Sequence, residues 1–164
     1  MRISTTSSLT NSTLNSQVMS ATVMYSGDEI KTFIPQREPM LMVDKLYTCD
    51  EASVEAGLTV SPDNIFVYDG GLFSEAGMIE HIAQSAALFA GYNDWINHRP
   101  IVLGYIAEIK NFALEATAHV GDSLVSRLNV VSQAMNITLM DATTTINGNV
   151  AAKCKIKIFM DKKK

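Results

Sequence analysis

The longest apolar pattern in the chain predicts one helix that is buried over most of its surface. Ser74 is a good helix N-cap, and Glu75 suits the first turn because negative charge stabilises the amino end of a helix. The apolar residues that follow cover more than half of the helix circumference, which indicates a helix enclosed by other elements. They are Met78, Ile79, Ile82, Ala83, Ala86, Phe89 and Ala90.

Strand patterns lie on both sides of this helix. Two precede it, at 41–49 and 54–60, and the second places alternate apolar residues on one face. Five follow it, at 101–109, 112–116, 124–131, 137–146 and 150–160. Asn147-Gly148 joins the last two and predicts a tight hairpin, because both residues tolerate positive φ.

The last strand has one apolar and one basic face. Alternate residues from Val150 to Met160 are apolar, and Lys153, Lys155 and Lys157 lie between them. The apolar face is predicted to pack on the core. The lysines are predicted to protect an exposed edge of the sheet.

The remaining segments complete an α+β pattern. The spacing of Ser26 and Glu29 is that of a capping box, and Pro35 ends the short helix that follows. Residues 61–71 are rich in Pro, Asp and Gly and predict an irregular loop. One antiparallel sheet wrapped around one long central helix is the hotdog fold, predicted here as a single domain over residues 26–161.

Composition limits the functional classes. The net charge of −4, with both signs interspersed, argues against nucleic acid as a partner. No apolar run reaches the roughly 18 residues of a membrane span. Residues 1–25 are rich in Ser, Thr and Asn and are predicted to be disordered. Cys49 and Cys154 lack the spacing of metal ligands, so we expect two reduced thiols in a cytoplasmic protein that needs no metal or cofactor.

Three segments, in order, resemble the 3-hydroxyacyl-acyl-carrier-protein dehydratases. Residues 34–45, IPQREPMLMVDK, resemble that family's LPHRxPxLLVDR opening, with Gln36 where His is usual. Residues 80–86, EHIAQSA, resemble the ExMAQxA stretch of its central helix, and Val120-Gly121-Asp122 resembles its PGD turn. A divergent branch, the dehydratases of aryl-polyene and flexirubin-type pigment clusters, also has a Gly-Gly loop before this helix.

The resemblance implies a helix carboxylate that works with a loop histidine. Glu80 occupies the carboxylate position, but counting back without a gap places Phe66 near the histidine position. The loop at 64–73 contains no histidine. The usual two-residue mechanism is therefore incomplete in this chain, although the resemblance still implies the fold and thioester binding.

Dehydration of a 3-hydroxyacyl thioester requires a base for a C2 proton and an acid for the leaving hydroxyl. Glu80 is the best candidate for handling the proton, and Gln84, one turn on, is expected to orient Glu80 or the loop. Tyr68 and Asp69 lie in the loop that normally carries the histidine, where either can serve as an acid or hydrogen-bond donor. A buried structural carboxylate and ordinary loop residues are the alternatives for these positions.

The other candidates concern substrate binding. Phe66, Gly70, Gly71 and Gly77 are predicted to lie near the substrate, because glycines allow the backbone to approach a thioester. Turn formation and close helix packing explain the glycines equally well. His81 points about 100° away from Glu80 around the helix and is expected to be a packed or interface residue.

These observations predict a dehydratase-like protein of fatty-acid or polyene synthesis. Its substrate is expected on an acyl carrier protein or coenzyme A, and its partner is a second copy or a hotdog paralogue that supplies the absent histidine. The alternatives are a catalytically silent subunit that binds acyl carrier protein or an active paralogue, and an acyl-thioesterase.

Overall fold

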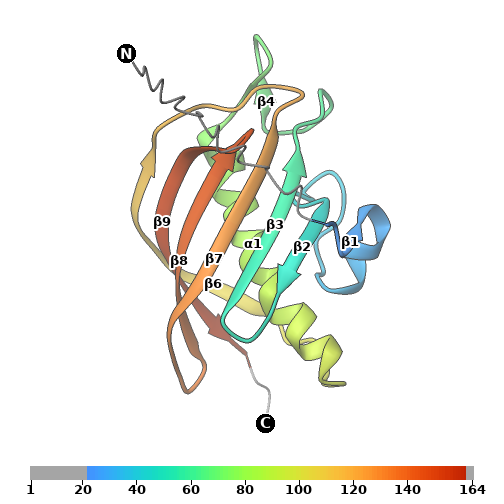
Figure 1. Cartoon of the computed structure of the whole chain (residues 1–164), viewed down its shortest axis with the longest axis vertical. Coiled ribbons are helices and arrows are strands. Elements are labelled where there is room, and N and C mark those ends of the chain that lie inside the picture. The colour runs from blue at the N-terminus through green and yellow to red at the C-terminus, as the bar shows by residue number, and fades with distance from the viewer. Residues whose placement is uncertain (1–21, 162–164) are drawn as a thin grey trace, which may run out of the picture.

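A seven-stranded antiparallel sheet curls around one helix in the computed structural model, which describes residues 22–161 (Figure 1). The helix is α1 (Glu75–Ile96). The strands, in sheet order, are β1 (Tyr25–Ser26), β2 (Lys45–Cys49), β3 (Ser53–Thr59), β7 (Ser123–Ala134), β8 (Ile137–Ile146), β9 (Asn149–Met160) and β6 (Gly104–Leu114). The α+β hotdog prediction is confirmed.

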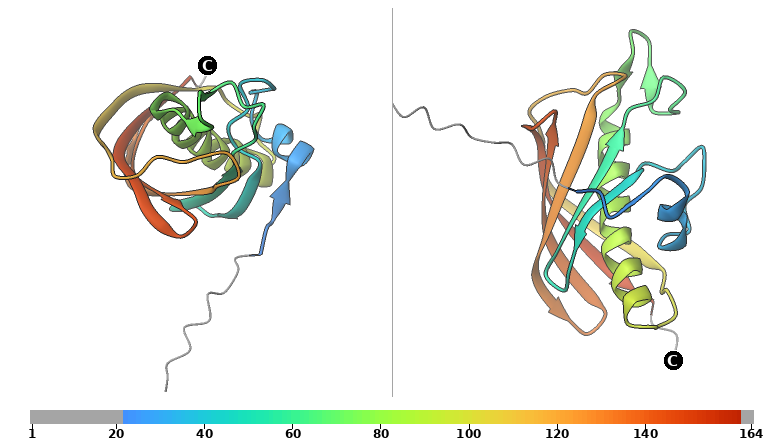
Figure 2. Two further views of the ribbon diagram at one scale, coloured as in Figure 1. Left: turned by 90° about the horizontal axis from the view of Figure 1, so that it is seen from above. Right: turned by 45° about the vertical axis from the view of Figure 1, so that its right-hand side comes forward.

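The helix begins where the sequence predicts. The Ser74 hydroxyl accepts a hydrogen bond from the backbone nitrogen of Gly77 at 3.1 Å. Seen along its length, α1 lies inside the curl of the sheet (Figure 2). The predicted alternation in β3 is also correct, because Val54, Ala56 and Leu58 are buried on the face that packs against α1. The hydrophobic core is therefore the layer between α1 and the concave face of the sheet.

Two strand predictions differ from the structure. The segments predicted at 101–109 and 112–116 form one strand, β6, whose pairing with β9 shifts at two irregularities. Asn111, beside the second, has a φ of 54°, which a strand pattern does not announce. The predicted strand at 41–49 is shorter, because only Lys45–Cys49 pairs within the sheet.

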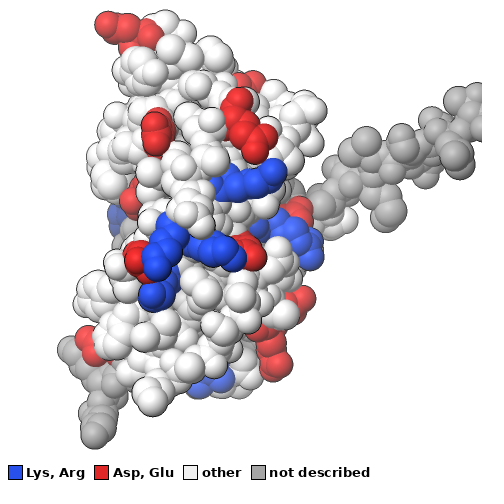
Figure 3. Space-filling model, turned by 90° about the vertical axis from the view of Figure 1, so that its left-hand side faces the viewer, with Lys and Arg blue, Asp and Glu red and all other residues white. Residues whose placement is uncertain are grey.

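The lysine-bearing strand does not lie at an edge. β9 pairs with β8 on one side and β6 on the other, so the predicted edge role of its lysines is wrong. Each lysine instead pairs with an acid of a neighbouring segment, such as Lys155 with Asp141 at 2.7 Å and Lys157 with Glu108 at 2.8 Å. Basic and acidic side chains accordingly lie side by side on the surface in Figure 3.

The start of β9 is one residue out of phase with the prediction. Ala151 is fully buried and Val150 is 41% exposed, the reverse of strict alternation. The cause is a register shift, because Thr144 faces Ala152 while Thr145 faces Val150. From Ala152 to Met160 the predicted inward face is correct.

Residues 27–44, between β1 and β2, pack over α1, and we call them the N-terminal cover. The helix η1 (Gly27–Thr32) is a 3-10 helix that ends before Pro35. The backbone of Ser26 donates to the Glu29 carboxylate at 3.0 Å, as the capping pattern predicts. Met24 already donates its backbone nitrogen to the backbone oxygen of Leu46, so the folded chain begins before the predicted start at residue 26. Of the segment predicted to be disordered, residues 1–25, residues 1–21 lie outside the described part.

The loop before α1 contains a small hairpin. β4 (Val67–Tyr68) pairs with β5 (Leu72–Phe73), so the prediction of an irregular loop was incomplete. Gly70 and Gly71 form its turn with φ values of 83° and 76°. The hairpin stands at the end of the molecule where α1 begins (Figure 1).

Gly91 allows the closest approach between α1 and the N-terminal cover. A Cβ at this position would overlap the backbone carbonyl of Phe33. We expect Gly91→Ala to lower the free energy of unfolding by about 1–3 kcal/mol through overpacking, despite the better helix propensity of Ala. Denaturant unfolding measures this change.

Gly104→Ala is the control, because its added methyl group meets side chains rather than backbone, the Met160 sulfur at 3.1 Å and Cγ2 of Ile158 at 3.2 Å. It is expected to stay within about 0.5 kcal/mol of the parent chain. Equal stability of Gly91→Ala and the parent would contradict the proposed contact.

Candidate functional site

The predicted pair on α1 is in direct contact. The Gln84 amide nitrogen donates to the Glu80 carboxylate at 2.7 Å. Gln84 is 1% exposed, whereas Glu80 is half-buried. The expectation that Gln84 orients Glu80 therefore fits the geometry.

The other contacts of Gln84 fix which way its amide points. Its oxygen accepts from the backbone nitrogen of Met42 at 2.7 Å, and its nitrogen also donates to the backbone oxygen of Met40 at 2.6 Å. Exchanging the oxygen and nitrogen of this amide would place its N–H groups against the Met42 N–H and its oxygen against the Met40 and Glu80 oxygens. The amide nitrogen is thus committed to one oxygen of the Glu80 carboxylate.

The same contacts explain why the segment before β2 is not a strand. The backbone of Met42 bonds to side chains of α1 on both sides, since its oxygen lies 2.8 Å from Nδ1 of His81. These side chains take the place of a neighbouring strand. Periodicity does not reveal this arrangement, because it depends on which side chains a distant helix presents.

Glu80 lies on a narrow cavity of about 160 Å³ between α1 and the start of β6. The polar side chains of its lining are those of Gln36, Glu80 and Gln84. The apolar lining comes from the N-terminal cover, α1, the chain before β6 and the end of β9. It comprises Phe33, Pro35, Ala83, Ala86, Ala87, Ala90, Ile101, Val102, Leu103, Ile106, Ile158 and Met160.

The narrow cavity meets a wide groove of about 1200 Å³. The two share Ala90, residues 101–103, Ile158 and Met160. Partly exposed residues at helical spacing run along α1 from the narrow cavity to the wide groove. We call them the groove stripe, and they are Glu80, Ala83, Ala87, Ala90 and Asp94. At 1.5 Å per residue the stripe is about 21 Å long.

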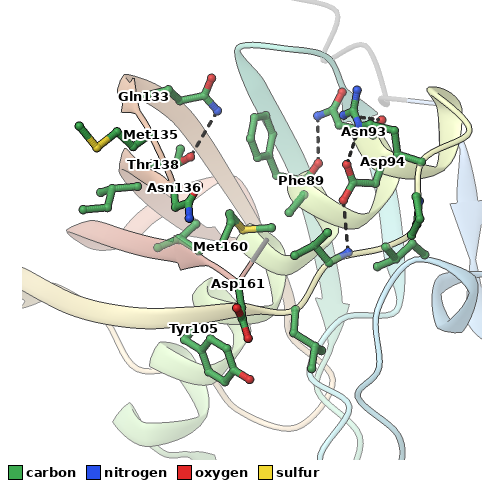
Figure 4. Close-up of a pocket in the computed structure, with 18 of the residues that line it drawn as sticks. Phe89, Asn93, Asp94, Tyr105, Gln133, Met135, Asn136, Thr138, Met160 and Asp161 are labelled. Atoms are coloured by element: carbon green, nitrogen blue, oxygen red, sulfur yellow. Dashed lines mark hydrogen bonds and ion pairs between the residues drawn. The ribbon is translucent and has the colours of Figure 1, made fainter. Parts of the chain in front are cut away.

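The wide groove has polar walls at its far end. Asn93 and Asp94 face the tip of the β7–β8 hairpin, where Gln133 contacts Thr138 at 3.3 Å (Figure 4). Met160 and Phe89 lie between these walls (Figure 4). The carboxylate of Asp94 holds Arg99 at 2.9 Å and so fixes the chain that closes the groove after α1.

The loop candidates lie apart from this network. Tyr68 is 54% exposed and Asp69 is exposed in the hairpin turn. No hydrogen bond within residues 22–161 joins either side chain to Glu80 or Gln84. A catalytic role for these two residues stays a prediction.

Phe66, which the sequence count predicts near the position of the family's histidine, packs against the start of α1. A Cβ on Gly77 would lie 2.7 Å from Phe66, so the glycine is required for this close approach. Phe66 also makes an edge contact with Phe73, with ring centroids 6.5 Å apart. Gly70 and Gly71 shape the hairpin turn, and their role in substrate binding remains untested.

None of the three histidines, all within the described chain, lines the narrow cavity. His81 is fully buried, as expected for a packed residue, and His98 and His119 are exposed in loops. Burial lowers the pKa of His81 to about 4. Its Nδ1 therefore donates to Met42 as part of a neutral ring, and its buried Nε2 has no partner among the described residues.

The two cysteines pack in or against the hydrophobic core. Both are free thiols, and burial raises the pKa of Cys49 to about 12 and that of Cys154 to about 11. Thiols with such pKa values are poor nucleophiles. Within residues 22–161 there is no cluster of three metal-ligating side chains, and no helix there has the length and apolarity to cross a membrane.

Sequence reasoning overlooked the position of Gln36. Its side chain lines the narrow cavity with Glu80 and Gln84, although 44 residues separate it from Glu80 in the chain. The signal was its place in the opening motif, where the resembling family carries His. The contact itself depends on how the N-terminal cover folds over α1.

Comparison with known proteins gives a consistent result. A family model described as ApeP-like, ApeP dehydratase, matches residues 28–164. Two curated proteins named 3-hydroxyacyl-[acyl-carrier-protein] dehydratase FabZ are similar over most of the chain. The one from Pseudothermotoga lettingae is 26% identical over 82% of this chain and 96% of its own length. The one from Wolinella succinogenes is 27% identical over 87% of this chain and 100% of its own length.

Solved structures share the fold. A chain of the dehydratase heterocomplex ApeI:P from Xenorhabdus doucetiae superposes with a TM-score of 0.76 at 17% identity, covering 82% of this chain and 91% of that one. A hypothetical thioesterase protein with coenzyme A from Streptococcus pneumoniae gives a TM-score of 0.58 at 14% identity, covering 70% and 83%.

The buried His81 predicts a loss of stability in mild acid. Its folded pKa of about 4 lies below the ordinary value of 6.5. As pH falls from 6.5 towards 4, the unfolded chain gains a proton that the folded chain does not, so stability is lost. We expect the free energy of unfolding to be about 2 kcal/mol lower at pH 5 than at pH 7 from this residue.

Denaturant unfolding at pH 7 and pH 5 measures this difference. His81→Asn should flatten the pH dependence, and His119→Asn, at an exposed residue, should leave it unchanged. An unchanged pH dependence in His81→Asn would assign the effect to other groups.

Proposed function

Because the chain belongs to the ApeP-like dehydratase family, we propose that it removes water from a 3-hydroxyacyl thioester with Glu80 as the proton-carrying residue. The observation that supports this proposal best is the half-buried Glu80 carboxylate, which Gln84 orients beside an apolar cavity. The polar groups serve the reacting end of the substrate, and the apolar lining fits its acyl chain.

One carboxylate suffices for the proton balance of this reaction. Elimination breaks a C2–H bond and the C3–O bond, forms the C2–C3 double bond and releases water. The net movement is one proton from C2 to the departing oxygen. Glu80 takes the C2 proton, delivers it to the leaving hydroxyl, and returns to the carboxylate.

Gln84 limits this exchange to one side of the carboxylate. It holds Oε1, so the other oxygen is the one available to substrate. Fixing the carboxylate in this way lowers the entropy cost of reaching the reactive geometry.

The substrate is proposed to arrive on an acyl carrier protein or as a coenzyme A thioester, as part of fatty-acid or polyene synthesis in the cytoplasm. The names of the FabZ relatives support the carrier protein. The chemistry at Glu80 is the same for either carrier, since both present the acyl group through a thioester.

We propose that a second hotdog protomer, a copy or a paralogue, pairs with β6. This strand is an edge of the sheet, and Tyr105 and Ile106 on it are 54% and 41% exposed. Unpaired edges that carry apolar side chains favour pairing with another chain. The ApeI:P neighbour is named as a heterocomplex, which supports a paralogue as partner.

Sedimentation of the purified chain tests the pairing. A second copy on β6 gives twice the mass of the 17.9 kDa chain, and a paralogue gives a dimer only after mixing. A chain that stays monomeric alone and with a dehydratase paralogue would contradict the proposal.

Glu80→Gln tests the chemistry, because it keeps the side-chain shape and a hydrogen-bond acceptor for Gln84. We expect about a 10²–10⁴-fold loss of enoyl product from a 3-hydroxyacyl carrier-protein thioester. Mass spectrometry follows the enoyl product and free thiol, so hydrolysis is distinguished from dehydration.

Glu115→Gln is the matched control. This glutamate is half-exposed and pairs with Lys153 at 3.4 Å, away from the cavity, and should retain activity. Full activity of Glu80→Gln would remove Glu80 from the mechanism.

A catalytically silent subunit is the second candidate, and the absence of histidine from the cavity lining favours it. In this case turnover appears only with an active paralogue and is indifferent to Glu80→Gln. The same mass-spectrometric experiment, repeated on the mixture, separates the two functions.

A further inference from the structure

The narrow cavity is too small for a long acyl chain. Its volume is about 160 Å³, and an apolar protein cavity of about 150 Å³ holds one benzene molecule, which has six carbons. With the reacting end of the substrate at Glu80, a chain of more than roughly six carbons has to extend beyond the narrow cavity. The adjoining wide groove of about 1200 Å³ has room for the rest of the chain.

The junction between the narrow cavity and the wide groove favours hydrocarbon over polar groups. Every residue that lines both spaces has an apolar side chain. These residues are Ala90, Ile101, Val102, Leu103, Ile158 and Met160. The pantetheine arm of a carrier protein or of coenzyme A contains amides, which would lose hydrogen bonds to water at such a junction. The acyl chain is therefore the part of the substrate that fits there.

The segment that forms one wall of the junction is held on both sides. The backbone nitrogen of Val102 donates to the Asp94 carboxylate of α1 at 3.3 Å. The backbone oxygen of Leu103 accepts from the backbone nitrogen of Asp161, just after β9, at 3.1 Å. These bonds fix the segment, so the width of the passage depends on the side chain that lies opposite it.

Met160, the last residue of β9, supplies the most adaptable side chain at the junction. Its sulfur lies over the start of β6, since a Cβ on Gly104 would be 3.1 Å from it. Met160 is partly exposed, whereas Ile158, which also lines the junction, is only 4% exposed. A methionine side chain is unbranched and rotates about several bonds, so it can move aside where a packed isoleucine cannot.

We infer that Met160 selects the acyl-chain length of the substrate by controlling passage from the narrow cavity into the wide groove. This inference rests on the proposed function, which places the reacting end of the substrate at Glu80. Short acyl groups remain within the narrow cavity. Longer ones displace the Met160 side chain and enter the wide groove beyond it. Met160 is thus a specificity-determining residue that takes no part in the proton transfer.

The test compares two saturated acyl amides of pantetheine, with chains of six and twelve carbons. Neither can lose water, so binding is measured separately from turnover. Calorimetry gives their dissociation constants on the native protein with any partner that purifies with it. The measured quantity is the chain-length ratio, defined as the affinity for the long ligand divided by the affinity for the short one. Each buried methylene adds about fourfold in affinity, so the ratio reports how many carbons pass the junction.

Met160→Ala should widen the passage and raise the chain-length ratio by about 4–16-fold, the effect of one or two further buried carbons. Met160→Phe should narrow the passage with a stiffer side chain and lower the ratio by a similar factor. Loss of contact alone would instead lower the ratio in Met160→Ala. Met24→Ala is the control, because it removes an exposed methionine that lines neither space and should keep the parent ratio.

The inference is overturned by an unchanged or lowered ratio in Met160→Ala, by an unchanged or raised ratio in Met160→Phe, or by loss of both ligands in both variants, which marks a structural role. If one variant binds neither ligand, the ratio of the other decides. A parent protein that binds neither ligand contradicts the inference as well.

The proposed function fails separately. A chain-length ratio that follows residue 160 without enoyl product from a 3-hydroxyacyl thioester, alone or with a paralogue, supports the passage and rejects turnover. Enoyl product with an unchanged ratio in both variants rejects the passage and supports turnover.

Discussion

The contact between α1 and the backbone of residues 40–42 determines the site. This segment has no neighbouring strand, so its polar groups need other partners close to the core. Gln84 bonds to Met40 and Met42, and His81 bonds to the other side of Met42. The requirement to satisfy a buried backbone therefore sets the direction of the Gln84 amide. That amide in turn holds Glu80 at the cavity, so the stability of the fold and the geometry of the site depend on the same hydrogen bonds.

One protomer supplies the carboxylate and an apolar cavity without a histidine beside them. Counting back from Glu80 predicts Phe66 near the position of the family's histidine, and Phe66 packs on Gly77, so an apolar ring stands at this predicted position. His81 does not compensate for this loss, because its Nδ1 is committed to Met42 and burial keeps its pKa near 4. In the proposed reaction, Glu80 alone carries the proton within one protomer, and the amide of Gln84 orients its carboxylate.

The elements that follow local rules were predictable from the sequence. The Ser74 cap, the apolar helix and the Asn147-Gly148 hairpin depend on residues close together in the chain. The errors arose where pairing with a segment distant in the sequence determines the structure. The lysines of β9 suggested an edge, but β6 pairs beyond them, and the register shift at Thr144 reversed the exposure of Val150 and Ala151. The site shows the same division, since Glu80 and Gln84 share a helix face whereas Gln36 arrives from another segment.

The open side of the site connects its chemistry to assembly. The narrow cavity lies against the chain that leads into β6, and Leu103 and Ile106 line it while remaining 52% and 41% exposed. Apolar side chains that face both a cavity and solvent are covered when another strand joins the edge. Pairing at β6 would then exclude water from the acyl path and strengthen the hydrogen bonds at Glu80, because their strength rises as the local dielectric falls. In this proposal a partner affects the reaction even where it contributes no catalytic side chain, since it would complete the wall behind the carboxylate.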